Sequence, residues 1–476
     1  MKKIIKTVAF AVTMAVLLAS CGSTSKAEGN SSKKAKKTKF NQTEFDSAYK
    51  AGDFGTCLNM IESRGSDSIL TGLDSSMLLY LSKDYSGSGR SFTEIQGEMN
   101  SVSKDMTAAK TMEAALISEN SVTYSGATYE RILAYSMKAV DSFKLGNVSS
   151  AVGVMNDYTG NYKEEIAALV AQQKELAKSS EGLTNDPKVS QATEAMSKAG
   201  IPVNFSSLTS KAPASTSAVY EASPFLSYLG TLAYAANGDT VHAKDFASVL
   251  KSTNSSVDVS EDLTVPAGKG RLDVIALTDK IGQRTQAGEQ ELIGQLGNVL
   301  VNFKVVYPIF GKQNHAISVS KVTLSNGESK AFTLIEDFDE AVKTDVESKA
   351  HGAYNRSLFR NITKNSAAVV AGIASLKAAE EAVNKAKGNK LKEAAATKAY
   401  EAAVTSVNAA LIAVVDAEKA DVRQASYFPH KASAAGFTVE PGTYTVTVEY
   451  SDGTKDVKDV TVAAGKPTVV ISEKMN

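Results

Sequence analysis

One group of acidic side chains lies close enough in the sequence to support chemistry. Glu336-Asp337 and Asp339-Glu340 stand at a predicted strand-to-helix junction. Carboxylates grouped in this way could form a general-acid pair or bind a divalent cation. The other interpretation is structural, because acids at the start of a helix cap its free N–H groups and complement its dipole.

The histidines offer little further chemistry at the level of the sequence. His242, His315, His351 and His430 are far apart, and none has the spacing of metal ligands. His242 opens a predicted helix and His315 lies in a predicted turn, which favours surface or capping roles. The chain also contains no GxGxxG, P-loop, HExxH or GxSxG motif. We therefore predict no catalytic residue and no metal or cofactor site.

A stripe of cations is the strongest candidate for a binding or structural site. Arg356, Arg360 and Lys364 recur every four residues, so they would lie on one face of a helix. Like charges at this spacing repel by a few tenths of a kcal/mol, which makes acidic partners expected. Within the chain these are Asp337, Asp339 or Asp421, and outside it an anionic polymer or partner. The alternative is a solvated face. The predicted site comprises Arg356, Arg360, Lys364, Asp421 and Arg423.

The N-terminus carries the pattern of an exported, lipid-anchored protein. Residues 2–6 include three lysines, and residues 8–18 are an apolar run too short to span a bilayer, as in a secretory signal. The run ends in Leu18-Ala19-Ser20-Cys21, which resembles the lipobox of bacterial lipoproteins. The resemblance implies cleavage between Ser20 and Cys21 and covalent diacylglycerol and acyl lipid on Cys21. Two or more acyl chains would hold the protein stably at a membrane.

Charge and cysteine content narrow the partners. Lysine plus arginine and aspartate plus glutamate each number 52, so the formal net charge is zero. A chain without a basic field is not expected to bind nucleic acid. With Cys21 lipidated, Cys57 is the one cysteine left, so the mature chain cannot form an intrachain disulfide. Its apolar neighbours predict a small buried side chain rather than a reactive thiol.

The first half of the chain is predicted to be helical. Residues 1–20 are the signal peptide, and residues 21–40, rich in Gly, Ser, Thr and Lys, form a flexible tether. From 41 to 255 apolar residues recur at spacings of three and four, between turns such as Gly52-Asp53. Gly suits a positive φ, and Asp caps the next helix. This predicts a tetratricopeptide-like array with an insertion at 160–222, and a generic helical bundle is the alternative.

The second half is predicted to be rich in strands. Residues 256–476 change to a period of two, with a hairpin signal at Asn326-Gly327 and one long strand over Val299 to Phe310. Residues 337–425 are predicted to form a helical arm divided at Gly388-Asn389. Strands before and after the arm are expected to share one sandwich, since a lone hairpin is unstable in water. The predicted fold class is α+β, with a β-sandwich-like domain carrying a long helical hairpin after the helical array.

Four stretches of the mature chain also share a resemblance. They are Asn120-Ser121-Val122 with Tyr129 to Leu133, Pro224 to Gly230, Arg356 to Lys364, and Asp421-Val422-Arg423 with Pro441-Gly442-Thr443-Tyr444. Together they resemble a family of uncharacterised envelope lipoproteins with tetratricopeptide-like repeats, found in spirochaetes and proteobacteria. That family has Thr, Trp and Leu where this chain has Val422, Ala425 and Phe428, which identifies a divergent member and puts any role of the Trp in doubt.

These patterns lead to one functional prediction and two alternatives. We predict a lipid-anchored envelope protein that acts as a non-enzymatic binding or scaffold module for a protein partner. Gly22 and Ser23 stand where an Asp would favour the inner membrane, so the outer membrane is favoured. Some members of the similar family are encoded near activators of peptidoglycan synthases, which implies a link to cell-wall or outer-membrane assembly. The alternatives are a wall- or glycan-acting enzyme using Glu336 to Glu340, and a surface-exposed structural lipoprotein.

Overall fold

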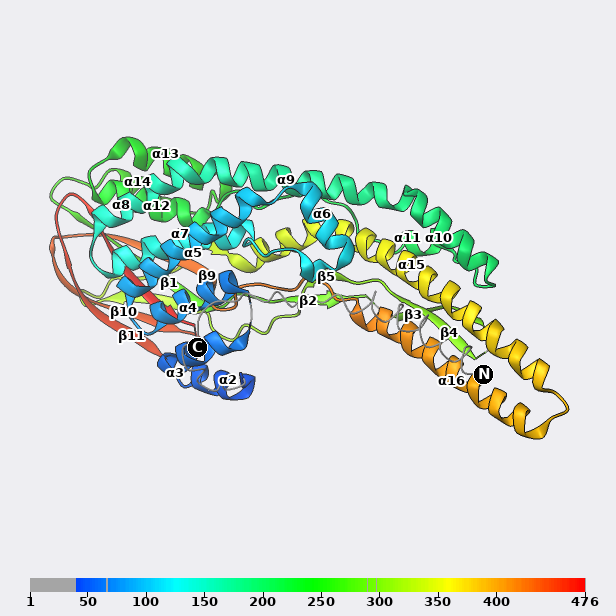
Figure 1. The fold of residues 1–476 in the computed structure, drawn as a ribbon. Helices are drawn as coiled ribbons and strands as arrows, with labels where there is room; N and C mark the ends of the chain where they lie inside the picture. Colours follow the sequence, from blue (N-terminus) through cyan, green and yellow to red (C-terminus); the bar gives the residue numbers. More distant parts are fainter. Residues whose placement is uncertain (1–39, 66, 289, 297, 476) are drawn as a thin grey trace, which may run out of the picture.

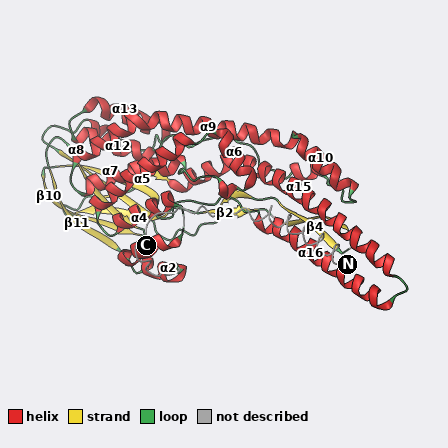
Figure 2. Ribbon diagram, viewed as in Figure 1, coloured by secondary structure: helices red, strands yellow, loops and turns green. Residues whose placement is uncertain are grey.

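Helices and strands both contribute extensively to this fold. The computed structural model describes residues 40–65, 67–288, 290–296 and 298–475. Helices come first, then strands, then two long helices and a last group of strands (Figures 1 and 2), so the predicted α+β class is confirmed. Cys21, the predicted signal peptide and nearly all of the predicted tether lie outside the described residues.

Helices of widely different length build the N-terminal region. They are α2 (Gln42–Lys50), α3 (Phe54–Ile61), α4 (Ser68–Leu81), α5 (Tyr85–Asp105), α6 (Ala108–Ile117), α7 (Thr128–Lys144), α8 (Val148–Asp157), α9 (Lys163–Gly182), α10 (Pro187–Lys198), α11 (Phe205–Thr209), α12 (Pro224–Ala236), α13 (Thr240–Thr253) and α14 (Ser260–Leu263). A π-helical turn, η3 (Tyr158–Tyr162), joins α8 directly to α9. The 3-10 turns are η1 (Glu62–Arg64), η2 (Glu119–Ser121) and η4 (Leu183–Asn185).

Four turns between these helices share one local mechanism. In each turn a residue with φ between 66° and 84° directly precedes an Asp or Asn. The carboxylate or amide oxygen of that residue then accepts a hydrogen bond from a backbone N–H in the first turn of the next helix. The predicted turn chemistry is confirmed, although one turn uses a lysine instead of a glycine. The pairs are Gly52-Asp53, Lys83-Asp84, Gly146-Asn147 and Gly238-Asp239.

Successive helices pack closely in pairs, α4 with α5, α7 with α8, and α12 with α13. In the last pair a side chain at Gly230 would place its Cβ 2.3 Å from the Phe246 ring, so the contact requires a glycine. Cys57, on α3, has no exposed surface and belongs to the same apolar core, as predicted. These pairs form a helical layer that covers one face of a sheet.

The strands form two larger sheets and two small pairs. The strands before the long helices are β1 (Gly270–Lys280), β2 (Arg284–Ala287), β3 (Gln290–Leu296), β4 (Val299–Lys304), β5 (Tyr307–Phe310), β6 (Val319–Leu324), β7 (Ser329–Ala331) and β8 (Thr333–Asp337). Those after them are β9 (Pro429–Val439), β10 (Gly442–Tyr450), β11 (Lys455–Val462) and β12 (Pro467–Lys474). The larger sheets have the orders β12-β1-β9-β8 and β11-β10-β6-β7, and the small pairs are β2-β5 and β3-β4.

Both larger sheets combine strands from either side of the long helices, which confirms the predicted pairing across the sequence. The β1 strand shows how the layers stack, because successive side chains point to opposite faces. Leu272 and Val274 belong to the apolar core that joins the two sheets, whereas Ile275 and Leu277 belong to the core shared with the helices. The sheet β12-β1-β9-β8 is therefore the central layer, between the second sheet and the helices.

Two long helices follow β8. The first, α15 (Phe338–Ala386), starts inside the body, and its later part pairs with α16 (Lys390–Ala417) in an arm that projects from the body (Figure 1). Gly388 has a φ of 90° and Asn389 caps α16, so the predicted division of the arm is confirmed. The early part of α15 is buried, so only part of the predicted 337–425 segment projects.

The expectation of one strand over Val299 to Phe310 is wrong. The segment is divided into β4 and β5, which pair with different partners. Side chains of α15 take over the backbone hydrogen bonds at the break, because the Lys304 N–H donates to Asn361 Oδ1 at 2.9 Å and the Val306 N–H to Ser357 Oγ at 3.0 Å.

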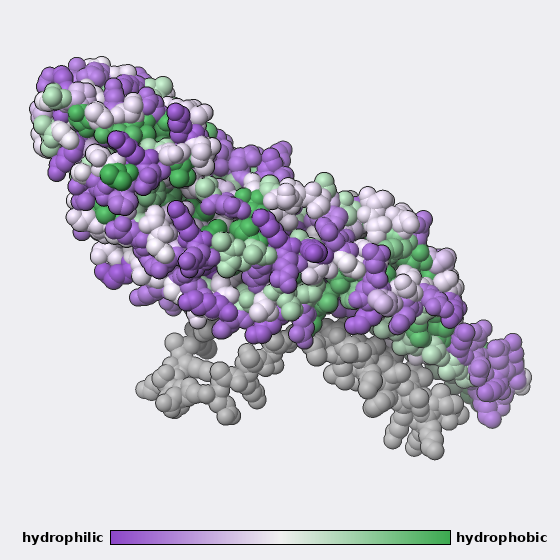
Figure 3. All heavy atoms as spheres, turned by 90° about the horizontal axis from the view of Figure 1, so that it is seen from above, coloured by the Kyte–Doolittle hydropathy of each residue, from purple (hydrophilic) through white to green (hydrophobic). Residues whose placement is uncertain are grey.

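Apolar surface is distributed along the molecule. Seen from above, hydrophilic residues cover much of the body and apolar residues interrupt them along its length (Figure 3). Among the described helices, α16 has the length and composition of a membrane-spanning helix. Its residues Val407 and Leu411, however, are buried in an apolar cluster with Leu376 of α15. The apolar seam of α16 therefore packs against α15 within the arm.

The positive φ at Gly146 gives a direct test of the turn mechanism. A Cβ at this position would meet no atom within 4 Å, so Gly146→Ala changes backbone strain alone. We expect it to lower the free energy of unfolding by about 1–2 kcal/mol. Gly153→Ala, inside α8 and also free of neighbours within 4 Å, should instead raise it by up to about 1 kcal/mol. Chemical denaturation of both variants measures the difference, and shifts of the same sign would contradict the assignment.

Candidate functional site

Arg356 and Arg360 are buried inside the molecule, on the part of α15 that lies in the body. Arg356 donates two hydrogen bonds to Glu119, from Nε to Oε1 and from Nη2 to Oε2, each 2.9 Å long. Arg360 donates from Nη1 to Glu119 Oε1 at 3.0 Å and from Nη2 to Glu418 Oε2 at 2.9 Å. Since only 1% of Arg360 is exposed, its charge must be matched by these carboxylates.

The acidic partners differ from the predicted ones. The sequence suggested Asp337, Asp339 or Asp421, but the partners are Glu119 on η2 and Glu418, which follows α16 directly. Only tertiary packing brings these two glutamates to α15, so spacing along the chain could not reveal them. Both stand a few residues from stretches that carry the family resemblance, near Asn120-Ser121-Val122 and Asp421-Val422-Arg423.

The other members of the predicted site lie at the edge of this network. Lys364 is partly exposed; its ammonium donates to the Ile117 carbonyl at 2.9 Å and lies 3.7 Å from Glu418 Oε1. Arg423 forms a two-pronged ion pair with Asp421, with both contacts at 2.8 Å, and also donates to the Val122 carbonyl. The predicted stripe is therefore an internal structural network for its two arginines, and a solvated face is excluded for them.

The network fixes the charge of Glu119. Burial raises the pKa of this carboxyl, but the guanidinium groups of Arg356 and Arg360 outweigh burial and hold its pKa below the ordinary value. A carboxyl whose pKa is lower in the folded state stabilises the fold above its unfolded pKa and loses this contribution as the pH falls through the folded value. The network is thus expected to be intact at neutral pH.

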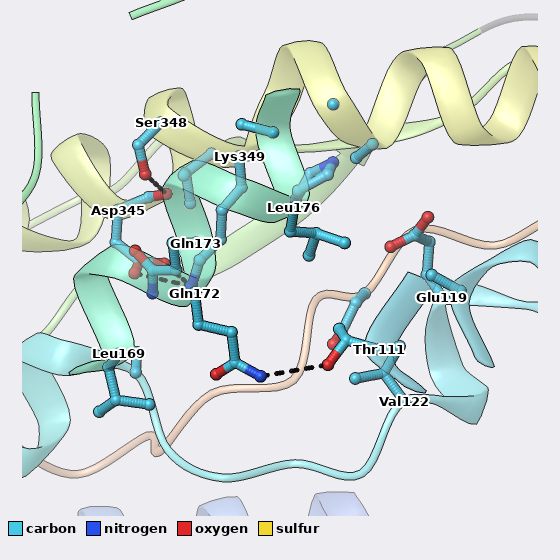
Figure 4. Close-up of a pocket in the computed structure, with 18 of the residues that line it drawn as sticks. Thr111, Glu119, Val122, Leu169, Gln172, Gln173, Leu176, Asp345, Ser348 and Lys349 are labelled. Atoms are coloured by element: carbon cyan, nitrogen blue, oxygen red, sulfur yellow. Dashed lines mark hydrogen bonds and ion pairs between the residues drawn. The ribbon is translucent and has the colours of Figure 1, made fainter. Parts of the chain in front are cut away.

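A cavity of about 200 Å³ opens beside this network. It lies between α9, α15 and the segment that follows η2, and Glu119 and Arg356 form part of its wall (Figure 4). One water needs about 10–15 Å³ of such space, so the cavity has room for about 13–20 waters or a small ligand. Its larger aliphatic lining residues are Met106, Val122, Leu169, Leu176, Val219 and Val346.

Apart from the exposed Lys174, the charged groups on the cavity wall are already paired. Asp345 accepts hydrogen bonds from Arg284 at 2.7 Å and from Lys349 at 2.7 Å, and burial of its carboxyl is outweighed by these two cations, so its pKa lies below the ordinary value. Gln172 donates to Thr111 Oγ1 at 3.4 Å, as the dashed line in Figure 4 shows. Gln173 differs, because its Oε1 atom is buried without a hydrogen-bond partner among the described residues.

The acids at 336–340 do not face this cavity as a pair. Glu336 is buried and accepts hydrogen bonds from Tyr220, Ser223 and the Phe225 N–H, at the start of α12. Burial raises the pKa of the Glu336 carboxyl to about 7, although the three hydrogen bonds act to lower it. Asp337 caps α15, as the structural interpretation predicted, and Glu340 is exposed and pairs with Lys343.

Two of the four histidines depart from the expectation that they are separate. His242 is exposed beside Asp239, and His351 contacts the Pro213 carbonyl at 2.8 Å. His315 and His430, in contrast, stack with ring centroids 3.4 Å apart, beside Asp337 and Asp339. Their spacing in the sequence could not indicate this contact. His315 lies in the loop between β5 and β6, whereas His430 lies in β9, more than a hundred residues later.

No protein-family model, curated protein or solved structure matches this chain. The resemblance to envelope lipoproteins therefore stays a prediction, and the geometry of the site carries the functional argument. The residues that spacing did not reveal are Glu119, Glu418, Arg284, Asp345, Lys349 and Gln173.

The buried position of Arg360 leads to a prediction about stability. Arg360→Ala leaves the Glu418 charge buried with the partly exposed Lys364 as its remaining cation, which should lower the free energy of unfolding by about 3–5 kcal/mol. Lys364→Ala, one turn further along α15, should lower it by less than about 1 kcal/mol because the side chain is 37% exposed. Urea denaturation compares the two variants, and equal small losses would contradict a network that stabilises the core.

Proposed function

We propose that this protein is a lipid-anchored, non-enzymatic binding protein of the cell envelope, and that the cavity beside α15 is its binding site. The observation that carries this proposal is how the charged groups of the cavity wall are paired. Apart from the exposed Lys174, its cations and carboxylates are paired with each other, and the described lining residues include no histidine or cysteine that could serve as base or nucleophile. Such a wall favours retention of a ligand over its chemical conversion.

The chemistry of the wall also selects the ligand. In the buried part of the wall, away from the exposed Lys174, a strongly charged ligand would have to break existing pairs such as Arg284 with Asp345, which costs more than it returns. An uncharged, partly apolar ligand would instead contact Leu169, Leu176 and Val346 and lose little hydration. A hydrogen-bond donor on this ligand would satisfy the unpaired Oε1 of Gln173.

The helical layer supports the proposal that the N-terminal region is a tetratricopeptide-like array. Paired helices, a residue with positive φ in each turn and a capping Asp or Asn are what such a unit requires. The array would offer an additional surface for a protein partner, in line with a scaffold role in wall or outer-membrane assembly. The lipid on Cys21, proposed from the lipobox, would keep both binding surfaces beside the outer membrane.

Site-specific photocrosslinking tests the cavity as the binding site. Ala177 lines the cavity from α9, whereas Ala109, on α6, is exposed and does not line it. With benzoylphenylalanine at position 177 of the full chain in native membranes, irradiation should add a small-molecule mass to the protein. The same group at position 109 should add none, as judged by intact mass spectrometry.

Two results would overturn this assignment of the cavity. Equal adducts at positions 177 and 109 would mean that the reaction is not specific to the cavity. No adduct at position 177, in protein that retains the wild-type thermal midpoint, would mean that the cavity retains no ligand. An adduct of protein size at position 177 alone would mean that the cavity binds a segment of a partner protein and not a small ligand.

A further inference from the structure

Five side chains that could bind a metal ion converge where α15 begins. Asp279 lies near the end of β1, His315 in the segment between β5 and β6, and His430 at the start of β9. Asp337 ends β8 and Asp339 stands in the first turn of α15. Pairing of β9 with both β1 and β8 brings these positions to one end of the central sheet. The cluster is separate from the cavity, because none of its members lines that site.

The distances within this cluster are those of atoms that could share one ion. His315 Nε2 lies 2.7 Å from Asp339 Oδ2, and His430 Nε2 lies 3.2 Å from Asp337 Oδ1 and 3.7 Å from Asp339 Oδ2. Four ligands placed tetrahedrally around Zn²⁺ at about 2.0–2.1 Å lie about 3.3 Å from one another. The measured separations bracket this value. Because the two rings are nearly parallel, one of them would tilt out of the stack so that both Nε2 lone pairs point at such an ion.

The arrangement of the two histidine rings favours a bound cation. They stack with centroids 3.4 Å apart and planes inclined by 13°, so two protonated rings would repel each other strongly. His430 is only 4% exposed, and it is its Nε2 atom, not the unpartnered Nδ1, that faces the carboxylates. Neutral rings that coordinate a cation avoid the repulsion and suit the buried site.

The charges around the two rings also favour a bound cation. Among the ion pairs of the described residues, Lys431 is the one lysine or arginine that pairs with these acids, through Asp337 Oδ2 at 3.3 Å. With both imidazoles neutral, three carboxylates opposed by one ammonium leave two negative charges uncompensated. A divalent cation would balance them, whereas an empty site would leave like charges together in a mostly buried place.

Surrounding groups hold the donors in position. The Gly282 N–H donates to Asp339 Oδ1 at 2.6 Å, which directs Oδ2 of the same carboxylate toward both histidines. Asp279 Oδ2 lies 3.9 Å from His315 Nδ1, and it accepts a hydrogen bond from the Ile317 N–H at 2.9 Å. A carboxylate behind the second nitrogen of a histidine is the usual outer-shell arrangement at metal sites, where it orients the ring and raises its basicity.

We propose that this cluster is a structural metal site that binds one Zn²⁺ ion through His315 Nε2, His430 Nε2, Asp339 Oδ2 and Asp337 Oδ1. Two imidazoles with two carboxylates suit Zn²⁺, whereas Mg²⁺ and Ca²⁺ prefer oxygen ligands alone. Four protein ligands leave no open position, which is the pattern of a structural rather than a catalytic zinc. The ion would tie the loop before β6 to β9 and to the start of α15.

A zinc titration of the full chain tests the site. The protein is purified in detergent without a polyhistidine tag, stripped with a chelator, and titrated with Zn²⁺ against a chromophoric competitor. We expect one Zn²⁺ per chain and a higher thermal midpoint, with no comparable effect of Mg²⁺ or Ca²⁺. His315→Gln and Asp339→Asn should weaken Zn²⁺ binding by about 100-fold or more, and Asp279→Asn, in the outer shell, by about 10- to 100-fold.

Matched histidine variants make the test specific. His242→Gln and His351→Gln remove the two histidines outside the cluster and should leave Zn²⁺ affinity unchanged. The proposal is overturned if the folded wild type binds no stoichiometric Zn²⁺, or if His315→Gln binds as tightly as the wild type. A cluster that is only hydrogen-bonded would show the first result, with a thermal midpoint that Zn²⁺ does not change. His315 is partly exposed, so its variant tests the site even if His430→Gln fails to fold.

Discussion

The buried ion network of Glu119, Arg356, Arg360 and Glu418 is the interaction on which the rest of the molecule depends. It contains two cations and two carboxylates, so it carries no net charge in a mostly buried region. The three elements that meet there are η2 from the helical layer, α15, and the segment after α16. Removing one member leaves a charge buried with less compensation, which is why this network defines how these elements must pack.

The long helix α15 connects the features that could carry function. Its start holds Asp337 and Asp339 of the proposed zinc site, and its next turns place Asp345 and Lys349 on the cavity wall. The ion network follows, and the helix then leaves the body and forms the arm with α16.

The cavity and the proposed zinc site differ in what their polar groups lack. On the cavity wall the charged groups other than the exposed Lys174 are paired with each other, so the buried part of the wall favours an apolar ligand with one hydrogen-bond donor near Gln173. Around His430 the carboxylates exceed the cations, so the demand is for positive charge. Each proposal follows from the same rule, that a buried polar group needs a partner of matching charge or hydrogen-bonding capacity.

Local patterns in the sequence determined the α+β class, the turns such as Gly146-Asn147, the division of the arm at Gly388-Asn389, and the helical face that carries Arg356 and Arg360. These features depend on residues a few positions apart, whose dihedral and capping preferences act within one turn of chain. The partners Glu119 and Glu418, the break between β4 and β5, and the contact of His315 with His430 were decided only by tertiary packing. Each joins residues that are distant in sequence, and periodicity along a single chain carries no information about such contacts.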